Sequence, residues 1–294
     1  MQKAQRIVIV IASVGRPDDI ADQLAALKNQ TRKPDGILLS VTEQSDLPPR
    51  HKRECAEVIF SPKGLCAQRN AALEHIGNDY DILAFFDDDY LPTKTVVEGI
   101  DWFFKQHQDV VGATGYLIAD GIKGPGIKFD EAMELIEKFE KAPAPKKSTT
   151  YGVNGLYGCN MAFRVSKIKD CRFDENLPFY GWQEDVDFAN RMAREGKLAA
   201  TNAFSGVHRG TKRSRSPGLK LGYSQIANVI YLMRKGTMPV SAGMMLMTKN
   251  FVANHARYFF PEKWVDRKGR TAGNWLALRD YVSKRLDPRK IFDL

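Results

Sequence analysis

Short apolar runs alternate with amphipathic segments over the first 110 residues of the chain. The run Arg6–Ala12 is almost entirely β-branched, which is typical of a strand buried on both faces of a parallel sheet. Three more strands are predicted, at 37–41, 58–60 and 80–86. Helices are predicted from Pro17 to about Gln30, from Leu65 to His75 and from Thr93 to His107. Strands that alternate with helices indicate an α/β fold with a Rossmann-like, mostly parallel sheet flanked by helices.

The pattern changes after Gly112. An amphipathic helix is predicted over Phe129–Lys141, followed by a Gly-rich, aromatic stretch from Tyr151 to Arg164. Further helices are predicted from about Asp185 to Glu195 and from Gly222 to Lys235. The periodicity after that point is weak. The second part of the chain therefore follows a different plan from the first.

The chain carries no recognisable export signal or membrane span. The apolar run Ile7–Ala12 is too short for a signal peptide, and no stretch reaches the about 18 apolar residues that a spanning helix needs. The four cysteines form no CxxC pair, so we expect free thiols. These features predict a cytoplasmic protein.

Charge is distributed unevenly along the chain. Residues from Val207 onward contain 18 Lys/Arg against 5 Asp/Glu, whereas the net charge of the whole chain is only +9. An acidic body therefore carries a basic last third. Such a surface favours anionic partners such as phosphates, acidic lipids, nucleic acid or an acidic glycan. A solvated basic face without a specific partner is the alternative.

The triplet Asp87-Asp88-Asp89 directly follows a predicted strand. Three adjacent carboxylates repel one another, and a bound Mn²⁺ or Mg²⁺ would remove that cost while leaving positions open for substrate phosphates. Ser13 and Thr42 also follow strands, and ligands of such sheets bind beyond the carboxyl ends of the strands. The alternative is a solvated turn that caps the next helix.

The segment Phe85–Pro92, with the acidic triplet inside it, is similar to the DxD segment of A-type (GT-A) glycosyltransferases, in particular the inverting family 2. Other segments resemble that family in the same order, namely Ile9–Pro17, Lys63–Asn70, Tyr157–Arg164, Gly181–Phe188, Val207–Arg209 and Tyr223–Lys235. The resemblance implies a GT-A catalytic domain over 1–222, with a nucleotide-binding half (about 1–110) and an acceptor half (about 111–222). A basic, mainly helical extension follows over 223–294.

The resemblance also implies a nucleoside diphosphate-sugar donor, with UDP favoured, and an acceptor hydroxyl on a glycan or lipid-linked saccharide. Asp89 is the expected metal ligand, and His208 either completes the metal shell or is an ordinary loop histidine. The metal would act as a Lewis acid on the leaving diphosphate. The implied nucleotide-binding residues are Ala12, Ser13, Gly15, Arg16, Glu43, Gly64, Arg69, Asp87 and Asp88. Because Thr42 and Glu43 stand where the family often has Asp, a base other than uracil stays open.

The pair Glu184-Asp185 resembles the acidic motif that opens the catalytic helix of the family. The resemblance assigns the general base to Asp185, with Glu184 as the alternative or as a group that orients the acceptor. A single displacement predicts inversion at the anomeric carbon. Asp187 is expected to serve the helix N-terminus. The whole set could also be ordinary N-terminal helix acids.

Two further groups of candidates surround this pair. Asn160, Tyr180 and Trp182 are predicted to contact a donor or acceptor sugar, although the two aromatic residues could equally be packing residues. A Ser- and Gly-containing loop could close over the diphosphate with its basic residues, or these could be solvated charges; they are Arg209, Lys212, Arg213 and Arg215.

Two other classes of protein share some of these features. A nucleotidyltransferase would need a Gly-rich, basic loop after the first strand, and Ser13–Pro17 is too short for that role. A nucleic-acid-binding protein is not expected, because no DNA or RNA module is recognisable and the basic residues are not interleaved with aromatic ones. The basic tail instead predicts an anionic membrane surface at the inner membrane face as a partner, contacted by 263–270 and 284–290 with Trp264, Trp275 and Tyr281.

Overall fold

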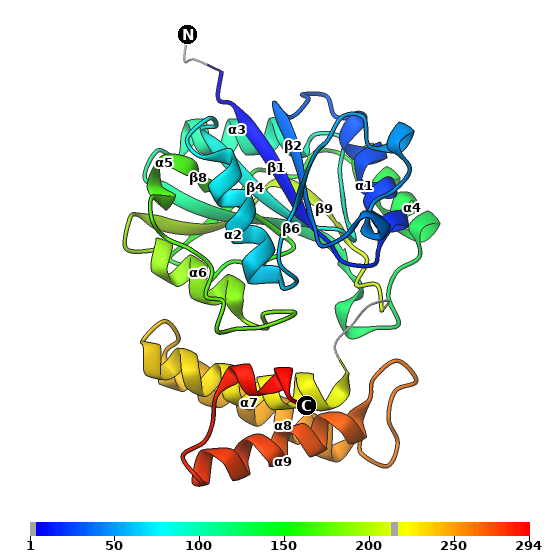
Figure 1. Ribbon diagram of the computed structural model, residues 1–294. Helices are drawn as coiled ribbons and strands as arrows, with labels where there is room; N and C mark the ends of the chain where they lie inside the picture. Colours follow the sequence, from blue (N-terminus) through cyan, green and yellow to red (C-terminus); the bar gives the residue numbers. More distant parts are fainter. Residues whose placement is uncertain (1–3, 213–216) are drawn as a thin grey trace.

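The computed structural model describes residues 4–212 and 217–294. These residues form a nine-stranded sheet with helices on both faces and a separate layer of helices built from the end of the chain (Figure 1). The strand order is β3-β2-β1-β4-β8-β6-β9-β5, and β7 pairs with β9. An α/β architecture with a helical extension is therefore confirmed.

The first half of the sheet is parallel. β1 (Ile7–Ala12) lies between β2 (Gly36–Val41) and β4 (Ile82–Asp87), and β3 (Glu57–Phe60) extends the sheet beyond β2. The β-branched residues of β1 are buried on both faces, as expected for a central parallel strand. All four predicted strands are confirmed.

The second half of the sheet mixes both directions. β8 (Asn160–Arg164) runs antiparallel to β4 and to β6 (Val110–Asp120), which runs parallel to β9 (Lys197–His208). Two short strands, β5 (Tyr90–Pro92) and β7 (Thr149–Tyr151), lie antiparallel to β9. Parallel pairing thus dominates only around the predicted nucleotide-binding half.

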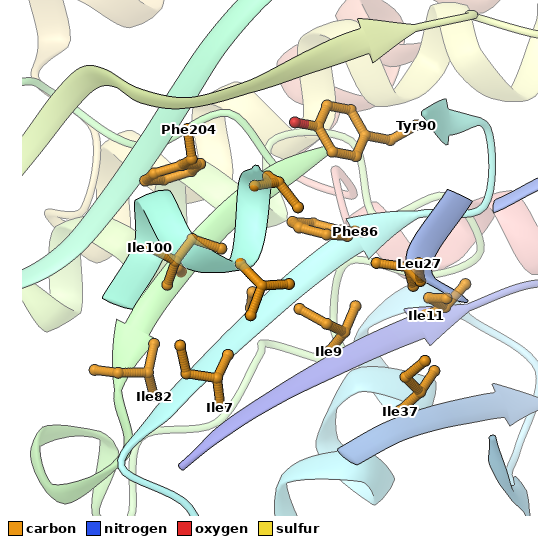
Figure 2. Packing of buried hydrophobic residues seen from close by; sticks show 14 of the residues in the cluster. Ile7, Ile9, Ile11, Leu27, Ile37, Ile82, Phe86, Tyr90, Ile100 and Phe204 are labelled. Carbon is orange, nitrogen blue, oxygen red and sulfur yellow. The ribbon is translucent and has the colours of Figure 1, made fainter. Parts of the chain in front are cut away.

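Two apolar cores lie on opposite faces of the sheet. Ile7, Ile9 and Ile11 point to the face covered by α1 (Pro17–Lys28) and α3 (Val96–Gln106), where Figure 2 shows Leu27 and Ile100 beside them. Val8 and Val10 point the other way, toward α2 (Leu65–Ile76) and α6 (Glu184–Met192). This alternation follows from the two-residue period of a strand.

One predicted boundary was wrong. A helix was expected to start at Thr93, directly after the acidic turn, but the chain first forms β5 and α3 begins at Val96. The pairing of Tyr90 with His208 and of Pro92 with Gly206 stabilises β5. Partners more than a hundred residues away leave no local signal in the sequence.

The remaining helices connect the strands. α4 (Phe129–Lys141) is confirmed at both ends, and α5 (Val165–Ile168) follows β8 directly. Short 3₁₀ helices at Gln44–Asp46, Arg50–Lys52 and Gly121–Lys123 belong to these connections, and another follows the last long helix of the chain at Pro288–Phe292.

The end of the chain forms three long helices, α7 (Gly218–Lys235), α8 (Val240–Ala256) and α9 (Arg267–Val282), which lie together below the sheet in Figure 1. α7 and α9 approach closely at Gly222, where a Cβ atom would lie 2.1 Å from the carbonyl oxygen of Arg270. Helix α7 starts four residues before its predicted start at Gly222 and spans the expected boundary at 222, so that division stays a prediction. Among the described residues, no helix is both long and apolar enough to cross a bilayer.

Candidate functional site

The carboxyl ends of β1, β2 and β4 meet at one edge of the sheet. Ala12 pairs with Ser40 on one side and with Asp87 on the other. The side chain of Gln68 on α2 donates hydrogen bonds to the carbonyl oxygens of Ser13 (2.9 Å) and Ser40 (2.8 Å). The strand ends converge as the sequence predicted, and Gln68, which the sequence did not single out, fixes their spacing.

The loop after β1 is attached to the middle acid of the triplet. Ser13 Oγ donates to Asp88 Oδ2 at 2.6 Å, and an Arg16 guanidinium nitrogen lies 2.8 Å from Asp88 Oδ1. Burial raises the pKa of Asp88, while the Arg16 charge acts in the opposite direction. Three of the predicted nucleotide-binding residues therefore form one cluster.

A carboxylate that the sequence did not identify supports the same loop. Asp46 is buried and accepts hydrogen bonds from the Gly15 amide (2.6 Å), the Thr42 amide (2.9 Å) and the Thr42 hydroxyl (2.7 Å). Burial works against ionisation, but these hydrogen bonds lower the pKa of Asp46. The predicted residue Glu43 is exposed and accepts only from Ser45 among the side-chain donors described. A 3₁₀ turn over 44–46 brings Asp46 back to the loop, and the role of Glu43 in nucleotide binding stays a prediction.

The outer acids of the triplet face a histidine. Asp87, Asp89 and His208 each offer one ligand atom, and these atoms lie within 4.8 Å of one another. His208 Nε2 is 3.3 Å from Asp89 Oδ1, and both side chains are buried. The β5–β9 pairing places His208 opposite Tyr90, one residue after Asp89. The three predicted residues are thus brought together from two distant segments.

The donor set fits a divalent cation. His208 Nδ1 lies 2.8 Å from Asp120 Oδ1, and Tyr157 donates to the other Asp120 oxygen at 3.0 Å. Burial alone would lower the pKa of His208, but hydrogen bonds with Asp120 and Asp89 raise it to about 10. A protonated imidazole therefore neutralises the carboxylates, and a cation can take the place of that proton on Nε2. Asp120 holds the second ring nitrogen as an outer partner. Asp120 could not be recognised from local pattern, because it lies at the end of a long irregular strand.

A second acidic pair lies across the cluster at the start of α6. Asp185 Oδ2 accepts from the Gly158 amide at 2.9 Å and Oδ1 from the Val186 amide at 2.8 Å. Burial raises the pKa of Asp185. Glu184 is more deeply buried, and its second carboxylate oxygen has no hydrogen-bond partner among the described residues. The two acids of the predicted catalytic pair therefore have different environments.

Arg69 links the two groups of acids. Its guanidinium contacts Glu184 Oε1 at 2.5 Å, Asp87 Oδ1 at 3.1 Å and the Gly158 carbonyl oxygen at 3.1 Å. The side chain is fully buried. Gly64 precedes α2, the helix that carries Arg69, and has a positive φ of 140°. The amide of the next residue, Leu65, donates to the carbonyl oxygen of Phe179 at 2.8 Å. The start and middle of α2 are thus connected to β4 and to the segment that leads into α6.

The predicted sugar-contacting residues lie at different depths. Asn160 is fully buried, and its side-chain oxygen accepts from Thr114 at 2.8 Å, so it supports the sheet beneath the site. Tyr180 is half exposed, and Trp182 is half-buried. Asn228 of α7 donates to the Trp182 carbonyl oxygen at 2.9 Å. Two of the three candidates are therefore accessible to an acceptor.

One prediction needs correction. Arg209 was expected on a mobile lid, but its guanidinium lies 2.8 Å from Asp19 and 3.2 Å from Asp22, so it is held against α1. Lys212 donates to the carbonyl oxygens at 121 and 122. Asp187 lies in the first turn of α6, as expected, and its carboxylate also accepts from Thr237 and Lys235, which connects α6 to the end of α7. Arg213 and Arg215 lie outside the described residues.

Solved structures of two other proteins have a similar fold. The mannosyltransferase PcManGT from Pyrobaculum calidifontis, in complex with GDP-Man and Mn²⁺, matches 99% of this chain and 86% of its own length at 14% identity, with a TM-score of 0.58. S. aureus TarS (1–349) matches 95% of this chain and 92% of its own length at 12% identity, with a TM-score of 0.53. At this identity the similarity shows the fold alone, and a search of curated proteins gives no match.

The family model described as glycosyl transferase family 2 matches residues 8–172, which is more than half of the chain. The match includes the first strand, the acidic triplet and Arg69, and it ends before the Glu184-Asp185 pair. The chain therefore belongs to glycosyl transferase family 2 and is a glycosyltransferase with the GT-A fold.

Proposed function

We propose that the protein is a metal-dependent inverting glycosyltransferase that moves a sugar from a nucleoside diphosphate-sugar to a hydroxyl group of a glycan or lipid-linked saccharide. The observation that carries the proposal is the connection through Arg69. Its guanidinium contacts Asp87 of the cation-binding cluster on one side and Glu184 on the other. Arg69 also donates to the Gly158 carbonyl oxygen, and the Gly158 amide donates to Asp185, so the cation site and the proposed base belong to one hydrogen-bonded network.

The nucleotide is proposed to bind at the strand ends, against Ala12, Ser13, Gly15 and Arg16, with Gly64 and Arg69 at its side. Asp46 is already engaged with Gly15 and Thr42, which argues against its use as a nucleobase acceptor. UDP remains the first candidate, and GDP is the second because a structural neighbour was solved with GDP-Man. The two nucleotides are distinguished by direct binding.

Asp89 and His208 are proposed to hold Mn²⁺ or Mg²⁺, with Asp87 at the edge of the cluster. The imidazole favours Mn²⁺, since Mg²⁺ usually takes only oxygen ligands. When bound, the cation supplies Lewis-acid stabilisation of the negative charge on the leaving diphosphate. The hydrogen bonds from Thr211 to Asp89, at 2.7 Å from the amide and 3.1 Å from the hydroxyl, orient that carboxylate.

Asp185 is proposed to be the general base. Two amide hydrogen bonds fix its carboxylate, and its raised pKa increases its basicity toward an acceptor hydroxyl. As the hydroxyl proton passes to Asp185, the hydroxyl oxygen forms a bond to the anomeric carbon and the bond to the diphosphate oxygen breaks. One displacement inverts the configuration. Tyr180 and Trp182 shortly precede Asp185 in the sequence, and they are proposed to stack on the acceptor ring.

A lipid-linked acceptor would place the enzyme at the cytoplasmic face of a membrane. The basic last third of the chain supports this part of the proposal, because it suits an anionic surface. A free oligosaccharide acceptor is the alternative, and it requires no membrane.

Thermal unfolding in the presence of nucleotides tests the proposal. UDP or GDP with Mn²⁺ should raise the midpoint temperature, EDTA should remove the effect, and Asp89→Asn should abolish it. Stabilisation by a nucleoside triphosphate alone would favour a nucleotidyltransferase. Stabilisation by an oligonucleotide without any response to nucleoside diphosphates would refute the proposal. A screen of sugar nucleotides for metal-dependent hydrolysis then identifies the donor.

A further inference from the structure

Helix α8 presents an exposed face that is almost free of charge. Val240, Met244, Met245 and Val252 have exposed fractions of 64, 50, 71 and 56%. At 100° per residue these positions span less than half of the helix circumference. The helix contains no Asp or Glu, and Lys249 is its only Lys or Arg. Exposed apolar surface of this extent on a soluble domain marks an interaction site.

Two aromatic residues extend this surface beyond the end of α8. Phe259 and Phe260 follow the helix after two residues and have exposed fractions of 80 and 88%, the latter being the largest among the exposed hydrophobic side chains described. We refer to Val240, Met244, Met245, Val252, Phe259 and Phe260 as the α8 apolar face.

The opposite side of α8 is fixed by buried polar groups. Asn254 donates to Gln225 on α7 at 2.8 Å and to Asn274 on α9 at 2.9 Å, and it accepts from Arg267 at 2.9 Å. Gly243 lies against Met233, whose sulfur would be 2.5 Å from an added Cβ. Rotation of the helix would break this network and leave polar groups buried without partners. The outward orientation of the apolar face is therefore determined by the packing of the helix.

The charges beside the α8 apolar face are basic. Lys249, Lys263 and Lys268 are exposed. Of the two acids among them, Glu262 is paired with Arg257 and Arg267, and Asp266 is exposed and caps α9, so lysine charge exceeds free carboxylate charge. A second copy of the chain would bring the same lysines against each other. An anionic lipid surface instead complements them, and an amphipathic helix with apolar side chains and lysines is typical of binding in the interface plane. Spanning is excluded by length, because 17 residues fall short of the about 20 that a bilayer requires.

We propose that the α8 apolar face inserts into the headgroup region of an anionic bilayer. This surface differs from the tail segments 263–270 and 284–290 that the sequence suggested, since its centre is α8 and the two phenylalanines. Membrane binding itself does not depend on the proposed function. Its role, which is to bring the site to a lipid-linked acceptor, rests on that function. Helix α7 packs against both α8 and the loop of Trp182, so docking would hold that loop at a fixed position above the bilayer.

Vesicle flotation of the full chain tests the inference. Wild-type protein should float with phosphatidylcholine vesicles that contain phosphatidylglycerol, and binding should weaken with added salt and without the anionic lipid. The double variant Phe259→Ser/Phe260→Ser should bind at least about ten-fold more weakly, because two apolar side chains no longer leave water. Phe60→Ser is the matched control, since Phe60 is 58% exposed on β3, and it should bind as wild type does.

Three results would overturn the inference: no flotation of the wild type at low salt, equal flotation of the double variant, or a wild-type dimer in sedimentation that the double variant dissociates. The last would assign the face to a second copy. Stabilisation by UDP or GDP with Mn²⁺ is measured on the same preparations. Nucleotide response without flotation refutes this inference alone, and flotation without nucleotide response refutes the proposed function alone.

Discussion

Arg69 and Glu184 form a buried ion pair with 2.5 Å between the guanidinium nitrogen and the carboxylate oxygen. Arg69 belongs to α2 and Glu184 to α6, so the pair joins the two halves of the domain. Burial raises the pKa of Glu184 as well, but Arg69 opposes that shift and occupies Oε1, and Glu184 is buried, so it is less accessible to an acceptor hydroxyl than Asp185. Asp185 is hydrogen-bonded only by two amides among the donors described, and it is free of such an ion pair there.

Asp185→Asn should therefore remove the base and leave the donor site intact. We expect kcat to fall by about 10²- to 10⁴-fold, the usual contribution of a general base. Metal-dependent stabilisation by the nucleoside diphosphate should stay at the wild-type level, as measured by thermal unfolding. Full turnover of this variant would assign the base to another residue.

The Arg69–Glu184 pair predicts a large loss of stability when one partner is removed. Arg69→Met leaves Glu184 buried without a countercharge, and we expect the free energy of unfolding to fall by about 3 to 5 kcal/mol. The double variant Arg69→Met/Glu184→Met should recover most of the loss, because neither charge then remains. Urea unfolding of the two variants measures both values. Equal stability of the single and double variants would show that the pair is not the source of the effect.

The parts of the site that the sequence predicted well are those that local pattern defines. The β-branched run of β1 and the apolar run before Asp87 required burial in a sheet, and the carboxyl ends of parallel strands then had to meet. Asp46 and Asp120 could not be predicted in this way. The first reaches the nucleotide loop through a 3₁₀ turn, and the second reaches His208 through the irregular pairing of β6 with β9. Both depend on contacts between segments whose relative position no local pattern fixes. The placement of Arg209 could not be predicted for the same reason, since its ion pairs reach back to Asp19 and Asp22.

Because Gly158 lies against Asp185, a larger side chain at position 158 should displace the proposed base. A Cβ atom at Gly158 would lie 3.1 Å from Asp185 Oδ2, which is tighter than ordinary van der Waals contact, so the carboxylate must shift. Gly158→Ala should lower kcat by about ten-fold or more, since small displacements of a catalytic group are costly, while KM for the donor changes little. Gly124→Ala is the control, because the nearest atom to its Cβ would be 4.0 Å away. An unchanged kcat for Gly158→Ala would argue that Asp185 is not the general base.

The ion pair of Lys235 with Asp174, in the segment before α6, predicts that stability falls at acidic pH. Lys235 at the end of α7 lies 2.5 Å from Asp174 and 2.9 Å from Asp187. Partial burial works against ionisation of Asp174, but hydrogen bonds from Lys235 and Tyr231 lower its pKa to about 2. A carboxyl group with a lowered pKa stabilises the folded state above its unfolded pKa of 3.8, and this contribution is lost as pH falls toward 2.

Asp174→Asn should consequently reduce the free energy of unfolding by about 1 kcal/mol at pH 6, after allowance for solvent screening. The difference from wild type should shrink as pH falls from about 4 to about 2, because the wild-type carboxylate is protonated over that range. Urea unfolding at a series of pH values measures it, with the exposed Asp170→Asn as the control. A difference that stays constant down to pH 2 would mean that Asp174 acts by packing and not by its charge. Lys235 at the end of α7 would then be held mainly by Asp187 of α6.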